Sequence, residues 1–145
     1  MSKKRIKNII IDSSKTIKPI VSDDTFNRWY LSDERHLAFS FFDMPKGKYN
    51  IESIKDNKFL ALILKRLKKL STMTWKDLKL SDRHGSGYEI IDKKSINGKI
   101  PQSITDDAQI IAFRGQGMSP IAGYRSGKTF HILFIDRDFT LYKHG

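Results

Sequence analysis

Residues 129–142 read TFHILFIDRDFTLY, and this stretch decides how the rest of the chain can fold. From 130 to 135 it is almost continuously apolar and rich in β-branched and aromatic residues, which is typical of a strand packed on both faces in the middle of a sheet. A short apolar run could also be helical, but Gly123 and Gly127 lie just upstream and the run is short. We therefore predict a central strand here, with His131 as its one polar side chain.

The stretch continues into a charged turn, Asp136-Arg137-Asp138, before the chain returns to apolar residues. Paired aspartates can hold magnesium for phosphoryl chemistry. The same pattern is also typical of a hairpin turn, because aspartate side chains accept hydrogen bonds from nearby backbone amides. We favour the turn over the metal site.

The segments before this stretch carry strand signals separated by turns. Residues 108–115 and 119–127 are short strand-like runs that end at glycines. Together with the last strand they predict a C-terminal β meander. Further strands are predicted over 36–44, where aromatic residues alternate with smaller ones, and over 88–91.

Residues 58–70, KFLALILKRLKKL, give the clearest helix signal in the sequence. Asp56 or Asn57 is placed to cap its N-terminus. Apolar residues recur at helical spacing and predict one broad buried face, made of Phe59, Leu60, Ile63, Leu64, Leu67 and Leu70.

A second, shorter helix is predicted over 75–80, because Thr74 and Asp77 have the spacing of a capping box. It is too short and too apolar to act as a DNA-reading helix. The elements together predict an α+β fold: a mainly antiparallel sheet with a C-terminal β meander, packed by one long and one short helix. No linker divides the chain, so we expect residues 1–145 to form a single domain, with residues 1–7 as a flexible basic arm.

The charge composition indicates what the protein binds and says little about how it folds. The chain has 27 Lys and Arg against 16 Asp and Glu, a net charge of +11. Such a surface favours nucleic acid as a partner, with an anionic membrane face second. The alternative explanation is an AT-rich genome, in which lysine accumulates on solvated faces.

Other features limit the class of protein. The chain has no cysteine, which excludes disulfides and Cys-ligated zinc. The four histidines form no HxH or HExxH pair, so we predict no metal and no cofactor. No secretory signal is evident, and the longest apolar run is too short to span a bilayer, so a cytoplasmic protein without membrane association is expected.

The polar side of the helix 58–70 carries only basic residues, and no acidic residue lies within it. Cations near a helix C-terminus suit the helix dipole, but the dipole does not explain the missing glutamates, which would supply i,i+4 pairs. We therefore predict binding to the backbone of RNA or DNA. The expected contacts are Lys58, Lys65, Arg66, Lys68, Lys69, Arg83, Arg114 and Arg125.

Two further functions stay open. A metal-independent ribonuclease needs a base for the ribose 2′-hydroxyl and an acid for the leaving oxygen, and His84 and His131 are the candidates. A histidine in an apolar strand is more commonly a core residue, so whether the chain is an enzyme is left undecided. The third hypothesis is a protein-binding inhibitor of a host or defence protein, whose basic face docks on an acidic partner.

Two resemblances bear on these choices. The block LKRLKKLSTMTWKDL at 64–78, with IAFRG at 111–115 and IAGYRSGKTFHILFIDRDFTLY at 121–142, resembles small uncharacterised proteins of bacterial phages and mobile elements. That resemblance implies an origin in a mobile element and no particular activity. In size and charge the chain is also similar to RelE-type ribonuclease toxins, but the order of elements departs from that family, whose helices come first.

Overall fold

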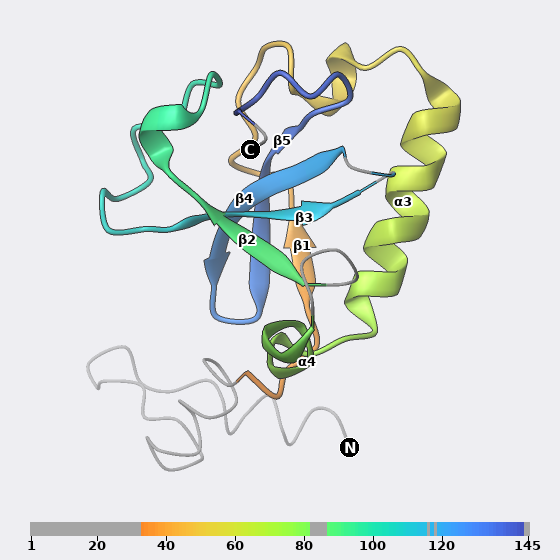
Figure 1. Ribbon diagram of the computed structural model, residues 1–145, viewed down its shortest axis with the longest axis vertical. Coiled ribbons are helices and arrows are strands. Elements are labelled where there is room, and N and C mark those ends of the chain that lie inside the picture. Colours follow the sequence, from red (N-terminus) through yellow and green to blue (C-terminus); the bar gives the residue numbers. More distant parts are fainter. Residues whose placement is uncertain (1–32, 82–86, 116, 118, 144–145) are drawn as a thin grey trace, which may run out of the picture.

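The chain folds around a five-stranded mixed sheet, shown in the computed structural model of Figure 1. The structure describes residues 33–81, 87–115, 117 and 119–143. The strands are β1 (Ala38–Ser40), β2 (Tyr88–Ile91), β3 (Ile110–Arg114), β4 (Pro120–Ser126) and β5 (Thr129–Ile135). Their order across the sheet is β1-β5-β4-β3-β2.

The strands from β2 to β5 form an antiparallel meander, and β1 pairs parallel to β5. β5 therefore lies between two other strands, and most of its residues are buried. This confirms the internal strand expected from the apolar run that begins at Phe130. A bulge between Ala122 and Gly123 interrupts the pairing of β4 with β5, and a Cβ atom at Gly123 would overlap the carbonyl oxygen of His131.

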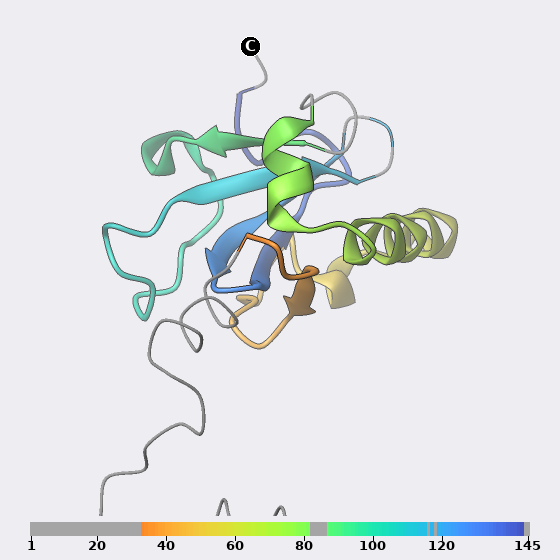
Figure 2. The same cartoon turned by 90° about the horizontal axis from the view of Figure 1, so that it is seen from below.

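Two helices, α3 (Asn57–Ser71) and α4 (Trp75–Leu80), cover one face of the sheet (Figures 1 and 2). Asp56 is the N-cap of α3, and its side chain accepts a hydrogen bond from the Phe59 amide at 3.0 Å. Thr74 and Asp77 form a complete capping box at the start of α4. Both helix starts and the α+β class are therefore confirmed. Among the described residues, two short 3-10 turns, η1 (Ile51–Ser53) and η2 (Lys93–Ser95), complete the elements.

The first core cluster fills the space between the helices and the sheet. α3 contributes Phe59, Ile63, Leu67 and Leu70, α4 contributes Trp75 and Leu78, and the strands add residues that include Phe113 and Phe130. The fully buried Trp75 ring has its centroid 6.1 Å from that of Phe113 and 6.3 Å from that of Phe130. Its indole Nε1 donates to the backbone oxygen of Lys128 at 3.0 Å, so the buried donor is paired.

The second core cluster lies on the opposite face of the sheet. It contains Ile91, Ile110, Ala112, Ala122, Leu133, Phe134, Leu141 and Tyr142. Three isoleucines from the irregular segment after β2, Ile96, Ile100 and Ile104, pack against it. The sheet is therefore buried on both faces, and the alternation along each strand decides which side chains face the helices.

Two local expectations are wrong. The strand predicted over 36–44 is limited to β1, because a turn closed by the Met44 amide and the Phe41 carbonyl at 3.1 Å ends it. Leu64, expected on the buried side of α3, is 69% exposed. The buried side is centred on Ile63 and Leu67, so Leu64 lies past its edge.

The charged segment after β5 is a turn held by an aspartate side chain, as predicted, but it is not a hairpin turn, because no strand follows β5 among the described residues. Asp136 is 1% exposed, and its two carboxylate oxygens accept hydrogen bonds from the backbone amides of Thr140 and Leu141 at 3.1 and 2.9 Å. In the part of the chain that the structure describes, no cluster of His, Asp and Glu side chains is able to hold a metal ion. Nor does any described helix have the length and apolar character of a bilayer span. The predicted basic arm, residues 1–7, lies outside the described residues.

Candidate nucleic-acid interface

The outer side of α3 carries four exposed lysines, Lys58, Lys65, Lys68 and Lys69, which we call the α3 lysine face. At 3.6 residues per turn, three of them (Lys58, Lys65 and Lys69) fall within about 40° around the helix axis. They extend over about 16 Å along it. Within the described ranges, none of the four forms an ion pair or a side-chain hydrogen bond. The positive charge of the face is therefore not compensated by any acidic side chain among the described residues.

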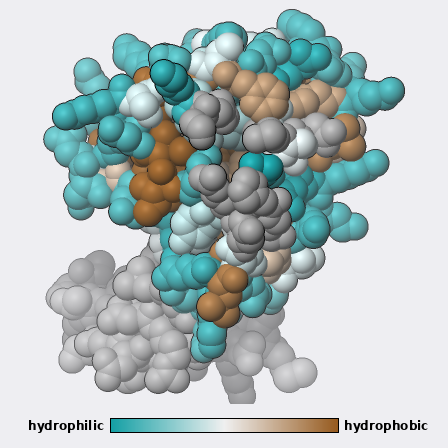
Figure 3. All heavy atoms as spheres, in the orientation of Figure 1, coloured by the Kyte–Doolittle hydropathy of each residue, from teal (hydrophilic) through white to brown (hydrophobic). Residues whose placement is uncertain are grey.

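The side of the molecule along which α3 runs is mostly hydrophilic, with apolar groups between the polar ones (Figure 3). The exposed Leu64 lies within this side, one residue before Lys65. The side of the same helix that faces the sheet is apolar and buried. Charged side chains therefore lie on one side of α3 and core side chains on the other.

Arg66, predicted as a contact to nucleic acid, lies at the border of this face and fixes the helix to the sheet. Its Nε donates to the backbone oxygen of Arg114, at the end of β3, at 2.7 Å. The side chain is half-buried, and burial lowers the pKa of the guanidinium below the ordinary value for arginine. Arg66 therefore positions α3 against β3.

Arg114 does not join the α3 lysine face with its side chain. The preceding even-numbered residues of β3, Ile110 and Ala112, belong to the second core cluster, on the face away from the helices. Strand alternation places the Arg114 side chain on that same face. Burial raises the pKa of the Tyr142 phenol, and the positive charge of Arg114 opposes this shift in part.

Arg125 is held in a structural network on the helix side of the sheet. Its guanidinium carbon lies 4.4 Å from the centroid of the Trp75 ring, and one terminal nitrogen pairs with Asp33 at 2.7 Å. Lys79 pairs with the other oxygen of Asp33 at 2.6 Å. The hydrogen bond from Lys79, and then that from Arg125, lower the pKa of the Asp33 carboxyl. Arg125 is therefore held within the fold by Trp75 and Asp33, and it shares the single charge of Asp33 with Lys79.

His131 points away from the helices and stacks on Tyr124 of the neighbouring strand. The two ring centroids are 4.5 Å apart and the planes are 9° from parallel. The Tyr124 hydroxyl donates to Oδ2 of Asp43 at 2.6 Å, and Nδ1 of His131 lies 3.7 Å from the same oxygen. Burial, and then the bond to Asp43, raise the pKa of Tyr124 to about 12. Nδ1 of His131 is buried and has no hydrogen-bond partner among the described residues.

Among the described residues, the structure does not bring the predicted RNA-cleaving residue His131 together with the predicted nucleic-acid contacts Arg114 and Arg125. Arg125 pairs with Phe130, and the side chains of Arg125 and His131 lie on opposite faces of the sheet. Arg114 pairs with Pro120, which is four residues, or about 13 Å along β4, from the position opposite His131. The other two predicted residues, Arg83 and His84, lie outside the described residues.

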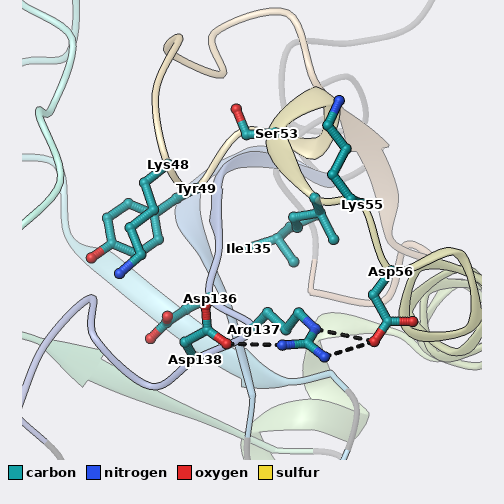
Figure 4. A pocket seen from close by; sticks show the side chains of 10 residues that line it. Lys48, Tyr49, Ser53, Lys55, Asp56, Ile135, Asp136, Arg137 and Asp138 are labelled. Atoms are coloured by element: carbon teal, nitrogen blue, oxygen red, sulfur yellow. Dashed lines mark hydrogen bonds and ion pairs between the residues drawn. The ribbon is translucent and has the colours of Figure 1, made fainter.

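A cleft of about 510 Å³ lies at the N-terminal end of α3 (Figure 4). It is lined by Lys48, Tyr49, Ser53, Ile54, Lys55, Asp56, Ile135, Asp136, Arg137 and Asp138. Arg137 donates to Asp56 at 2.8 Å and to Asp138 at 3.0 Å, so the basic and acidic charges compensate each other. The cleft therefore has no excess of positive charge, and we do not place the interface there.

No pattern in the sequence indicates that Asp43 lies beside His131. Asp43 lies in a loop far from β5 along the chain, and its bond to Tyr124 joins residues 81 positions apart. The register of β4 with β5 could have placed Tyr124 beside His131, because the two-residue turn at Gly127 and Lys128 sets that pairing.

Comparison with known proteins adds no family to this description. No protein-family model, no curated protein and no solved structure matches the chain. The geometry and charge of the described residues are therefore the basis for proposing a function.

Proposed function

We propose that the protein binds the phosphate backbone of RNA or DNA through the α3 lysine face. The observation that carries the proposal is a row of four exposed lysines without acidic partners among the described residues. Lysines in such a row replace the counterions condensed on nucleic-acid phosphates, and the release of those ions favours binding at low salt.

Helix electrostatics alone does not account for this face. Lys68 and Lys69 lie in the last turn of α3, where cations interact favourably with the helix dipole. Lys58 lies in the first turn, where the dipole disfavours a cation and where α3 has no acidic residue. A phosphate ligand would stabilise the lysines of both ends.

A pair of matched variants tests the proposal. Lys65→Gln/Lys69→Gln removes two charges from the α3 lysine face, and Lys94→Gln/Lys99→Gln removes the same charge from the segment 93–99, which lies across the molecule from α3 (Figures 1 and 2). The measurement is the affinity for a duplex oligonucleotide as a function of salt. The α3 variant should reduce the slope of log K against log salt by about 1.8, because each lost contact contributes about 0.9.

The control variant should keep the slope of the wild-type protein. Equal loss in both variants would show that only net charge matters, and the α3 lysine face would not be the interface. An acidic protein that copurifies in place of nucleic acid would favour a protein-binding inhibitor instead.

A second candidate function is metal-independent cleavage of RNA, and the position of the Asp43 carboxylate near Nδ1 of His131 favours it. A carboxylate beside Nδ1 of a histidine orients the ring, so that Nε2 is the atom able to take the proton of a ribose 2′-hydroxyl. The 3.7 Å separation is longer than a hydrogen bond, as catalytic contacts often are without substrate. RNA left intact by the wild-type protein, or cut equally by His84→Ala and His131→Ala, would eliminate this function.

A further inference from the structure

The loop that follows β1 presents two phenylalanines to solvent. Phe42 is 91% exposed and Phe41 is 40% exposed. Large aromatic side chains are usually buried, because leaving them in water forgoes the free energy of burial. Among the large apolar side chains of the described residues, Phe42 is the most exposed. Because Phe41 and Phe42 are consecutive, the two rings together offer apolar surface to a ligand, which a single exposed residue would not.

The backbone of this loop is held in place by its own hydrogen bonds. The Phe42 amide donates to Oγ of Ser40 at 3.2 Å, and the Met44 amide donates to the Phe41 carbonyl at 3.1 Å. Asp43, between them, accepts the hydroxyl of Tyr124 at 2.6 Å and so ties the loop to β4. The two rings are therefore displayed on a fixed turn, and a ligand that stacks on them loses little free energy in ordering it.

The rest of the loop is cationic. Lys46 and Lys48 are both exposed, and neither is ion-paired with a described residue. The ammonium of Lys48 donates to Oγ1 of Thr140 at 2.8 Å, so Lys46 is the lysine of this loop that is available to a ligand. Asp43 is the only acidic residue between 41 and 48, and its carboxylate is bonded to Tyr124. The loop then leads through η1 to the N-terminal end of α3 (Figure 1). The aromatic and basic side chains of residues 41–48 therefore lie shortly before the α3 lysine face along the chain.

We infer that residues 41–48 bind unpaired bases of a single-stranded nucleic acid, which stack on Phe42 and Phe41 while Lys46 contacts an adjoining phosphate. The inference rests on the proposed function, because the α3 lysine face supplies the remaining backbone contacts. Bases within a duplex are stacked on one another and cannot lie flat on a protein ring, whereas single strands offer every base to an aromatic side chain.

An anionic membrane is the other surface that attracts aromatic and basic residues together. Stable attachment to a bilayer needs a large buried apolar area or a lipid anchor. Two rings on a polar turn supply much less apolar area than attachment to a bilayer needs. Binding of a single strand needs only that one base stacks on each ring. The observations therefore favour nucleic acid.

The test compares Phe42→Ala with Ile90→Ala. Ile90 is 61% exposed on β2, at the opposite edge of the sheet from β1, so it controls for loss of an exposed apolar side chain. Affinities are measured at one salt concentration for a single-stranded oligonucleotide and for a duplex of the same length. Phe42→Ala should weaken single-strand binding by about 5- to 100-fold, as expected for loss of one stacked base.

Duplex binding should be unchanged in Phe42→Ala, and Phe42→Trp should retain single-strand binding. Unchanged single-strand binding in Phe42→Ala, together with salt-sensitive binding by the wild-type protein, would overturn the inference and leave the α3 lysine face intact. Absence of any binding by the wild-type protein would remove both proposals. Anionic vesicles bound through Phe42, without an effect on oligonucleotides, would assign the loop to a membrane surface and overturn the inference.

Discussion

At the scale of single residues, the tripeptide Asp136-Arg137-Asp138 shows how two identical side chains acquire different roles. Asp136 is buried and satisfies two backbone amides of the segment that follows β5. Asp138 has a side chain that is 56% exposed and shares Arg137 with Asp56. The first aspartate is therefore part of the fold, and the second contributes to a surface ion pair, which is usually weak.

Asp136→Asn should destabilise the protein by about 1–3 kcal/mol, because the new amide group would turn a donor toward a backbone N–H that is left unpaired. Asp138→Asn should cost less than about 1 kcal/mol. Urea denaturation of the two variants measures both free energies of unfolding. Equal costs would contradict the assignment of Asp136 as the buried acceptor of the turn.

At the scale of elements, α3 divides its two sides between the core and solvent. The sequence was sufficient to predict its extent, its capping aspartate and its basic outer side, because these depend on spacing along one helix. It did not predict that Leu64 is exposed, because the edge of the buried stripe depends on how the helix is rotated against the sheet. The contact from Arg66 to the end of β3 is one of the interactions that define this rotation.

Two leucines of α3 test this rotation. Leu67 is 7% exposed, so Leu67→Ala should lower the free energy of unfolding by about 2–5 kcal/mol, through lost burial and the cavity left behind. Leu64 is 69% exposed, so Leu64→Ala should change it by less than about 1 kcal/mol. Thermal or urea unfolding of the pair gives the comparison. A cost for Leu64→Ala as large as that for Leu67→Ala would show that the helix packs in another orientation.

At the scale of the whole molecule, the meander could be predicted and the placement of its charged side chains could not. Glycine-ended apolar runs are a local signal, so three C-terminal strands followed from the sequence. The parallel pairing of β1 with β5 joins distant segments and had no local signal. The turn at Gly127 sets the register that pairs Arg125 with Phe130, and this separates Arg125 from His131 across the sheet.

The exposure of Phe42 was also beyond sequence reasoning, because an apolar residue in an alternating run predicts a strand. The structure ends that strand early and leaves the ring outside the core. The turn between Phe41 and Met44 is the feature that leaves the Phe42 ring exposed, and this turn had no signal in the sequence.

The salt dependence of binding by the wild-type protein tests the central claim most directly. The affinity for a short duplex oligonucleotide should fall linearly on a log–log scale, with a slope of about −3.6 if the four lysines of the α3 lysine face each contact a phosphate. A slope near zero, or no binding at low salt, would contradict backbone binding and reduce the net charge of +11 to a property of composition.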